Sequence, residues 1–240
     1  MDQLVQSPRS SQHERYARAD LHRAIVRRAV SAADWALVAE LRKDGFSRVP
    51  GVEPSGPWLD DLDRGPAAFS LLGFALDGTP LATMRVQDGR QGPLELRRFI
   101  DIDTVLSPEE RPAAQFGRLS VLRSPENIHV MFAIFKTAWH WCAAEGLRTI
   151  IIASPSWSKP IYDFMHFDSA GAAGRFAHHY AGGAVHETMK LPIHAWKRAG
   201  AAATCRSPIS TLPCITPCSN PKGTRNPCNL NRSNRTFPRR

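Results

Sequence analysis

The chain carries arginines and aspartates at positions from which they can form a charge-paired site. Asp60 and Asp63 lie three residues apart in a segment rich in proline, glycine and aspartate. A guanidinium group binds both oxygens of a carboxylate in a fixed planar geometry, so these aspartates can pair with Arg42, Arg85 or Arg118. The pairing would close the loop over a binding site. A solvated charged loop with ordinary surface arginines is the alternative.

Aromatic side chains near the middle of the chain can line an apolar pocket, although the same helical spacing is typical of a plain core. They are Phe132, Phe135, Trp139, Phe164 and Phe167.

Histidine and cysteine residues do not predict a metal site. His140 lies near Cys142, and His178 is followed by His179, but no carboxylate or cysteine stands at a matching spacing. We therefore expect no bound metal.

The stretch 115–167 organises the predicted fold. Its pattern predicts a strand over 116–122, an amphipathic helix over 125–145, a strand over 148–154 and a short helix over 159–167. Ser124 suits the N-cap, Pro125 the first helical position and Gly146 a left-handed C-cap. Two strands joined by a helix form a βαβ unit, so they should lie parallel and side by side.

The flanking segments add strands and one more helix. Ser31 and Asp34 predict a capping box for a helix that Gly45 ends, after a short strand over 24–26. Asp77-Gly78 between two apolar runs predicts a β-hairpin over 69–86.

Further strands are expected over 94–100 and 185–191. We expect an irregular loop over 49–66, a loop or short helix over 101–114, and a loop or irregular strand pair over 171–183. The predicted class is α/β (α+β), a mixed central sheet with helices on both faces.

Charge and cysteine are concentrated at the C-terminal end. The 240 residues carry a formal net charge of +9, yet residues 200–240 hold seven lysines and arginines and no acidic residue. Four of the five cysteines lie there too, where a disulfide framework or a metal site would lack a paired CxxC signature. We expect a mobile arm over 1–24, one domain over 25–198 and a disordered basic tail over 199–240. Nucleic-acid binding through the tail is disfavoured because the body is nearly neutral.

No apolar run approaches the ~18 residues that a membrane-spanning helix needs, and the first residues hold no apolar signal core. We expect a cytoplasmic protein with reduced cysteines.

Five short motifs follow one another along the chain: RKDGF at 42–46, WLDDLD at 58–63, DGTPLATMR at 77–85, QFGRLSV at 115–121 and IYDFMHF at 161–167. Their order, over about residues 25–195, resembles the GNAT acyltransferase superfamily. The finer resemblance is to its branch that uses acyl carrier protein, the autoinducer (acyl-homoserine-lactone) synthases and the N-acyl amino acid synthases. Ala82 stands where the hairpin motif usually has glycine.

The resemblance implies transfer of a fatty acyl group to the amine of an amino acid or a related small molecule. The donor would be acyl carrier protein or, as second choice, acyl-CoA, with no permanently bound cofactor. In this fold the two parallel strands splay apart, which leaves main-chain N–H groups to bind the thioester carbonyl. The implied substrate-binding residues are Arg42, Phe46, Trp58, Asp60, Asp63, Arg85, Arg118, Leu119, Val121 and Leu122.

The implied catalytic positions are Gln115 and Tyr162. Tyr162 stands where many GNAT enzymes keep a tyrosine that protonates the leaving thiolate, with packing on the sheet edge as the alternative. Gln115 replaces the usual glutamate, and Gly117 replaces a serine. A glutamate can help remove a proton from the attacking amine, whereas an amide cannot act as a base.

Two function hypotheses follow. In the first, the chain is an N-acyltransferase whose proton leaves through water and another group. In the second, it is slow or inactive, a binding or regulatory protein that keeps the fold. Segment 122–130 lacks the glycine-rich loop that binds the pyrophosphate of acyl-CoA in ordinary GNAT acetyltransferases, which favours a carrier-protein donor.

Overall fold

The computed structural model describes residues 23–49, 51–52, 57–122, 124, 127–178 and 182–194, and every structural statement below refers to these residues. Nearly all of the predicted N-terminal arm and the whole cysteine-containing tail lie outside them, as do Pro125 and His179.

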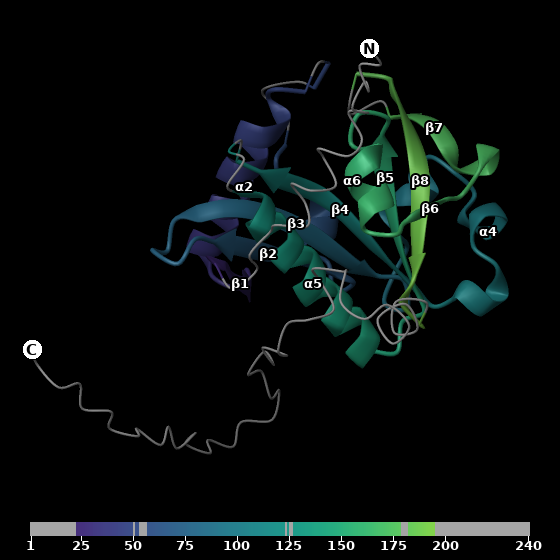
Figure 1. Cartoon of the computed structure of the whole chain (residues 1–240), viewed down its shortest axis with the longest axis horizontal. Coiled ribbons are helices and arrows are strands. Elements are labelled where there is room, and N and C mark those ends of the chain that lie inside the picture. The colour runs from purple at the N-terminus through teal and green to yellow at the C-terminus, as the bar shows by residue number, and fades with distance from the viewer. Residues whose placement is uncertain are drawn as a thin grey trace, which may run out of the picture.

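Eight strands form one mixed sheet in the order β1-β2-β3-β4-β5-β8-β6, with β7 also paired to β8 (Figure 1). Only β4 and β5 are parallel to each other; every other pair is antiparallel. The expected βαβ unit and mixed sheet are thus confirmed. The strands are β1 (Ile25–Arg28), β2 (Ala68–Phe74), β3 (Pro80–Asp88), β4 (Ala113–Val121), β5 (Thr149–Pro155), β6 (Asp168–Ser169), β7 (Arg175–His178) and β8 (Ala184–Pro192).

Helices cover both faces of this sheet. Helix α5 lies on one face, where Phe132 and Ile134 are buried in the largest apolar cluster. Helix α2 lies on the other face, where Val38 packs with Leu72. The helices are α2 (Ala32–Phe46), α3 (Asp61–Arg64), α4 (Ile102–Val105), α5 (Ile128–Ala144) and α6 (Lys159–Phe164), and the 3₁₀ turns are η2 (Glu95–Arg98), η3 (Pro108–Glu110) and η5 (Ala172–Gly174).

Several local predictions are confirmed. The capping box of Ser31 and Asp34 begins α2, with both reciprocal hydrogen bonds present. Gly78 has a φ of 88° in the turn between β2 and β3. Gly146 has the predicted left-handed backbone, with a φ of 71°, but it follows the C-cap of α5, which is Glu145. At both sites a left-handed backbone ends one element, a conformation that glycine adopts without a Cβ penalty.

The predicted end of α2 at Gly45 is wrong, because the helix runs through it to Phe46 and its C-cap is Ser47. Gly45 serves close packing instead. A Cβ at this position would lie 2.1 Å from the Oγ atom of Ser120 in β4. The missing side chain therefore lets α2 press directly onto the strand.

The predicted strand over 94–100 is also wrong, because this segment forms the turn η2. Two glutamine side chains from the sheet bind its backbone: Gln87 Oε1 accepts from the N–H of Glu95 at 3.3 Å, and Gln115 Oε1 accepts from the N–H of Leu96 at 2.9 Å. A strand ladder is not needed to satisfy these groups.

Other boundaries differ by a few residues. Helix α5 begins at Ile128 with Asn127 as N-cap, not at 125 after Ser124, and α6 ends at Phe164, before Phe167. The loop over 49–66 is not wholly irregular, since Asp60 caps the short helix α3.

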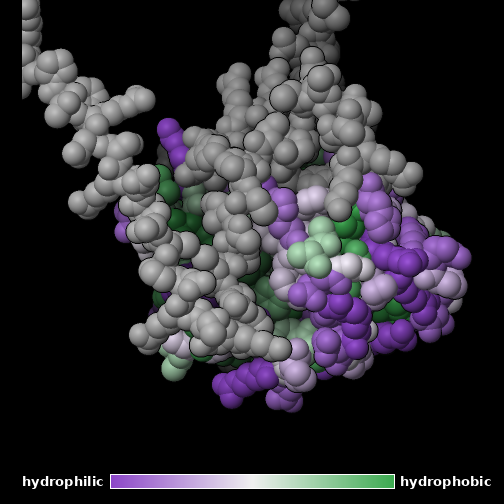
Figure 2. Space-filling view, turned by 90° about the horizontal axis from the view of Figure 1, so that it is seen from below, coloured by the Kyte–Doolittle hydropathy of each residue, from purple (hydrophilic) through white to green (hydrophobic). Residues whose placement is uncertain are grey.

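The described surface has the usual polar character of a folded domain. Figure 2 shows hydrophilic side chains gathered over much of one side, with apolar residues visible between them. None of the described helices is long and apolar enough to cross a lipid bilayer.

Candidate functional site

The two parallel strands separate part of the way along the sheet. Pairing between β4 and β5 runs from Ala113 with Thr149 to Phe116 with Ile152 and then stops, although β4 continues to Val121 and β5 to Pro155. Beyond Ile152, β5 pairs only with β8. Figure 1 shows β4 and β5 running apart. We call this gap the opening, and it confirms the predicted splay.

A β-bulge lies directly at the opening. Gly117 pairs with Arg85 and Ser120 with Thr83, so Arg118 and Leu119 together face the single residue Met84. Arg118 has a φ of 53°, an unusual value for a residue with a side chain. The strand thus bends where β5 leaves it.

The bulge and the pairing determine which main-chain donors are free. The N–H of Leu122 donates to the carbonyl of Leu81 at 2.8 Å, so the prediction that this group is free to bind a thioester is wrong. Along an antiparallel strand the N–H groups alternate in direction. That of Val121 therefore points away from β3 and toward the opening.

On the face that α2 covers, three guanidinium groups meet three carboxylates in what we call the charge cluster. Its members are Arg42, Arg85, Arg118, Asp60, Asp63 and Glu95. It confirms the pairing of the two aspartates with all three predicted arginines, and it adds a carboxylate that the sequence did not indicate.

The inner end of the cluster joins α2 to α3. Arg42 forms a two-pronged pair with Asp63, with distances of 2.7 and 2.8 Å from Nη1 and Nη2. It also donates to the carbonyl of Trp58 at 2.9 Å and to the hydroxyl of Ser70 at 3.2 Å. The Arg42 and Asp63 side chains are fully buried, so this pair anchors the loop.

The outer end connects three separate segments. Arg85 Nη1 lies 2.6 Å from Asp60 and 3.4 Å from Asp63, and its Nη2 lies 2.6 Å from Glu95. Arg118 Nη2 lies 3.0 Å from Asp60 and 3.1 Å from Glu95. Asp60 and Glu95 therefore each bridge the same two arginines, and only Asp60 and Arg118 are partly exposed.

Electrostatics keep the buried carboxylates ionised. Burial opposes ionisation of Asp63, but the hydrogen bond and charge of Arg42 outweigh it, so the pKa of Asp63 lies below its usual value. Burial likewise opposes ionisation of Glu95, and the charges of Arg85 and Arg118 hold the pKa of Glu95 below its usual value. A carboxylate so stabilised is a weak base.

Gln115 lies beside this cluster in a structural contact. Its side-chain oxygen accepts from Leu96, as described above, and the residue is almost fully buried. Its predicted catalytic role stays a prediction. The position that the resemblance assigns to a carboxylate is occupied by an amide, which binds the residue next to Glu95 in η2.

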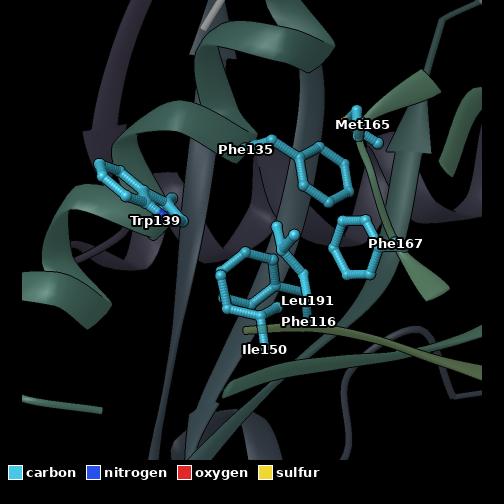
Figure 3. Close-up of a pocket in the computed structure, with 7 residues that line it drawn as sticks. All are labelled: Phe116, Phe135, Trp139, Ile150, Met165, Phe167 and Leu191. Carbon is cyan, nitrogen blue, oxygen red and sulfur yellow. The ribbon is translucent and has the colours of Figure 1, made fainter. Parts of the chain in front are cut away.

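The face that α5 covers is apolar. A pocket of about 240 Å³, which includes space open to solvent, lies there (Figure 3). It is lined by Phe116, Phe135, Trp139, Ile150, Met165, Phe167 and Leu191. Three of the five predicted aromatic residues line it, whereas Phe132 and Phe164 pair with each other, their ring centroids 5.8 Å apart.

Tyr162 lies on this apolar side, in α6. Its ring contacts Phe135 and Phe167 at centroid distances of 6.0 and 5.8 Å. Burial raises the pKa of Tyr162 to about 12, so its hydroxyl stays protonated at neutral pH. The predicted proton transfer to a thiolate is not tested by this geometry.

The remaining predicted residues lie at the ends of the site. The rings of Phe46 and Trp58 lie 6.5 Å apart and are partly exposed. Leu119 packs against the main core. Sequence reasoning missed Glu95, Ser70 and Gln87. Cross-strand pairing could have indicated two of them, because Ser70 lies opposite Arg85 and Gln87 lies opposite Gln115, whereas Glu95 lies outside the sheet.

No family model matches this chain, and no curated protein matches its sequence. Solved structures do. FeeM, an N-acyl amino acid synthase from uncultured soil microbes, superposes with a TM-score of 0.58 at 14% identity, over 78% of this chain and 98% of FeeM.

Two further structures represent other activities on the same fold. The AHL synthase LasI matches with a TM-score of 0.51 at 15% identity, over 71% of this chain and 90% of LasI. A GCN5-related N-acetyltransferase from Kribbella flavida matches with a TM-score of 0.50 at 18% identity, over 72% and 99%. The fold is therefore the acyltransferase fold of the GNAT superfamily.

Proposed function

We propose that the protein is an N-acyltransferase that moves a fatty acyl group from the thioester of acyl carrier protein, or of coenzyme A, to the amine of an amino acid or an amino-acid-derived molecule. The amine nitrogen attacks the thioester carbon, the C–S bond breaks, and the carrier leaves as a thiol. The observation that carries the proposal is the opening, a gap in the sheet with an apolar face on one side and a charged face on the other.

Each side of the opening suits one part of this reaction. The N–H of Val121 points toward the space where a thioester carbonyl would lie and can stabilise the developing oxyanion. The apolar pocket suits the acyl chain, although its side chains must move to admit more than a few atoms. Arg118 and Asp60, the partly exposed end of the charge cluster, suit the carboxylate and the amine of an amino acid.

The proton of the attacking amine needs an acceptor. Gln115 cannot serve, because an amide is not a base and its side-chain oxygen already accepts a hydrogen bond from Leu96. We propose that it leaves through water. A cytoplasmic location and acyl carrier protein as the partner belong to this proposal as well.

Incubation with acyl-carrier-protein thioesters of several chain lengths and a pool of amino acids tests the proposal. We expect amine-dependent release of free thiol and an N-acyl product of matching mass. A reaction without amine controls for hydrolysis, and acyl-CoA in place of the carrier protein separates the two donors. Absence of product with every donor and amine would contradict the proposal.

A non-catalytic binding protein with the same fold is the second candidate, because an amide stands at residue 115 and is already hydrogen-bonded. The Gln115→Glu variant separates the two candidates. A large gain of activity from a low background indicates a degenerate enzyme, little change from an active wild type indicates that the wild type is already competent, and no activity in either protein favours the binding protein.

A further inference from the structure

Glu95 is held in place from two neighbouring strands. Gln87 in β3 and Gln115 in β4 are cross-strand partners, and their side-chain oxygens accept from the consecutive N–H groups of Glu95 and Leu96. Leu94 and Leu96, on either side of Glu95, are buried in an apolar cluster. The position of the Glu95 backbone is thus fixed independently of its side chain.

The Glu95 carboxylate then spans two arginines, one oxygen to each. Oε2 lies 2.6 Å from Arg85 and Oε1 lies 3.1 Å from Arg118. Arg85 is fully buried, whereas Arg118 lies partly exposed at the opening. The carboxylate therefore ties a fixed guanidinium in the core to one whose main chain forms the bulge.

The backbone of Arg118 needs such a restraint. A left-handed conformation is unfavourable for a residue with a Cβ and persists only where the surroundings determine it. Asp60 and Glu95 hold the Arg118 side chain from two separate segments, the start of α3 and the turn η2. These contacts favour the bulged conformation over a regular strand.

We propose that Glu95 is a positioning residue of the site: through Arg118 it maintains the bulge of β4 and so directs the N–H of Val121 toward the opening. Glu95 does not touch the reacting atoms in this role. This inference rests on the proposed function, but its structural half can be measured without any activity.

Amide hydrogen exchange on the full chain measures that half. Leu122 donates to Leu81 directly after the bulge, and Ser120 pairs with Thr83. In the Glu95→Gln variant we expect exchange of these two amides to rise about tenfold, as befits loss of a hydrogen bond to a charged group, while the amides of α5 keep their wild-type rates. Unchanged exchange at Ser120 and Leu122 in the folded variant would overturn the proposal.

Two variants control this experiment. Glu110→Gln removes a carboxylate that pairs with Lys190 at 2.7 Å, outside the cluster, and should leave both amides unchanged. Glu95→Asp retains the charge on a shorter side chain, so it keeps the protein folded if Glu95→Gln does not. We expect it to raise the exchange of both amides as well, and wild-type exchange in Glu95→Asp would also overturn the proposal.

The activity half separates positioning from binding. Because misplacement of a donor by about 1 Å can cost ~100-fold in rate, we expect Glu95→Gln to lower kcat at least about tenfold and to leave KM for the thioester within about threefold. A change in KM without a change in kcat would contradict a positioning role for Glu95. If the wild type transfers no acyl group, the proposed function fails, and the exchange measurement still decides whether Glu95 maintains the bulge.

Discussion

The two faces of the sheet at the opening are built in different ways. On the α5 side, aromatic and aliphatic side chains from α5, β4, β5, β8 and the segment after α6 line the pocket. On the α2 side, six charged residues from α2, the start of α3, β3, η2 and β4 meet at distances of 2.6 to 3.4 Å. The apolar face is held together by how well its side chains fill space, and the charged face by specific contacts between pairs of atoms.

This contrast determines how each face responds to change. Apolar cores tolerate substitutions that conserve volume, usually at a cost below about 1.5 kcal/mol. A buried ion pair that loses one partner leaves an uncompensated charge in a dry environment. The charged face should therefore be sensitive to changes of a few atoms, and the apolar face to changes of size.

The largest effect is expected for Asp63→Asn, which keeps the shape and removes the charge that Arg42 faces. We expect the free energy of unfolding to fall by about 3–5 kcal/mol, the usual result of breaking a buried pair. Urea unfolding measures this. Asp103→Asn is the matched control, because Asp103 pairs with the exposed Arg97 and Arg111 and should cost less than about 1 kcal/mol. Equal losses in the two variants would remove the distinction between the faces.

The pH dependence of stability should report the same carboxylates. A carboxylate whose folded pKa lies below its unfolded value stabilises the protein above the unfolded pKa, about 4, and this contribution is lost as pH falls through the folded pKa. Asp63 and Glu95 both have lowered pKa values. We expect urea midpoints of the wild type to fall steeply below about pH 4, and those of Asp63→Asn less steeply. Parallel curves would show that Asp63 contributes nothing to acid sensitivity.

The contact between α2 and β4 predicts an intermediate effect. In Gly45→Ala the new Cβ would meet Ser120 Oγ, which donates to the carbonyl of Leu41 at 2.5 Å. We expect a loss of about 1–3 kcal/mol by overpacking, despite the better helix propensity of alanine. A thermal-unfolding cycle with Ser120→Ala should show a smaller loss in the alanine background. Additive losses would mean that the two residues do not contact each other.

The smallest effect belongs to the apolar face. Trp139→Ala enlarges the pocket, so preference in acyl transfer should shift toward longer chains by about tenfold, the low end of discrimination for one methylene. Competition between two chain lengths measures the shift. Trp141→Ala removes the same side chain from the same helix but from a contact with Phe69 outside the pocket, and should leave the preference unchanged. A shift in both variants would assign the effect to the helix as a whole.

Local patterns were sufficient to predict most of the fold. The capping box at Ser31, the turn at Gly78 and the βαβ unit depend on residues close in sequence, and the structure confirms them. Gly45 shows the limit of this reasoning. We predicted that Gly45 ends the helix because of the residues next to it in the sequence. Its role is instead set by close contact with Ser120, which lies 75 positions away.

The site shows the same limit. The aspartates and arginines were predicted from their side-chain chemistry and the resemblance, and they do meet. Glu95 was assigned to a strand, because nothing near it in the sequence indicates that Gln87 and Gln115 would bind its backbone and that of Leu96. The carboxylate that completes the charge cluster is determined by which segments, distant in the sequence, lie next to each other in the fold.

The equal numbers of positive and negative groups in the charge cluster have a consequence at long range. Opposite charges a few ångströms apart cancel beyond a Debye length, about 10 Å at 0.1 M salt, so the cluster projects almost no field into the solvent. It should not draw ionic substrates in from a distance, and the association rate of an amino acid should change little with ionic strength. Recognition at this site would begin only once the substrate is in contact with it.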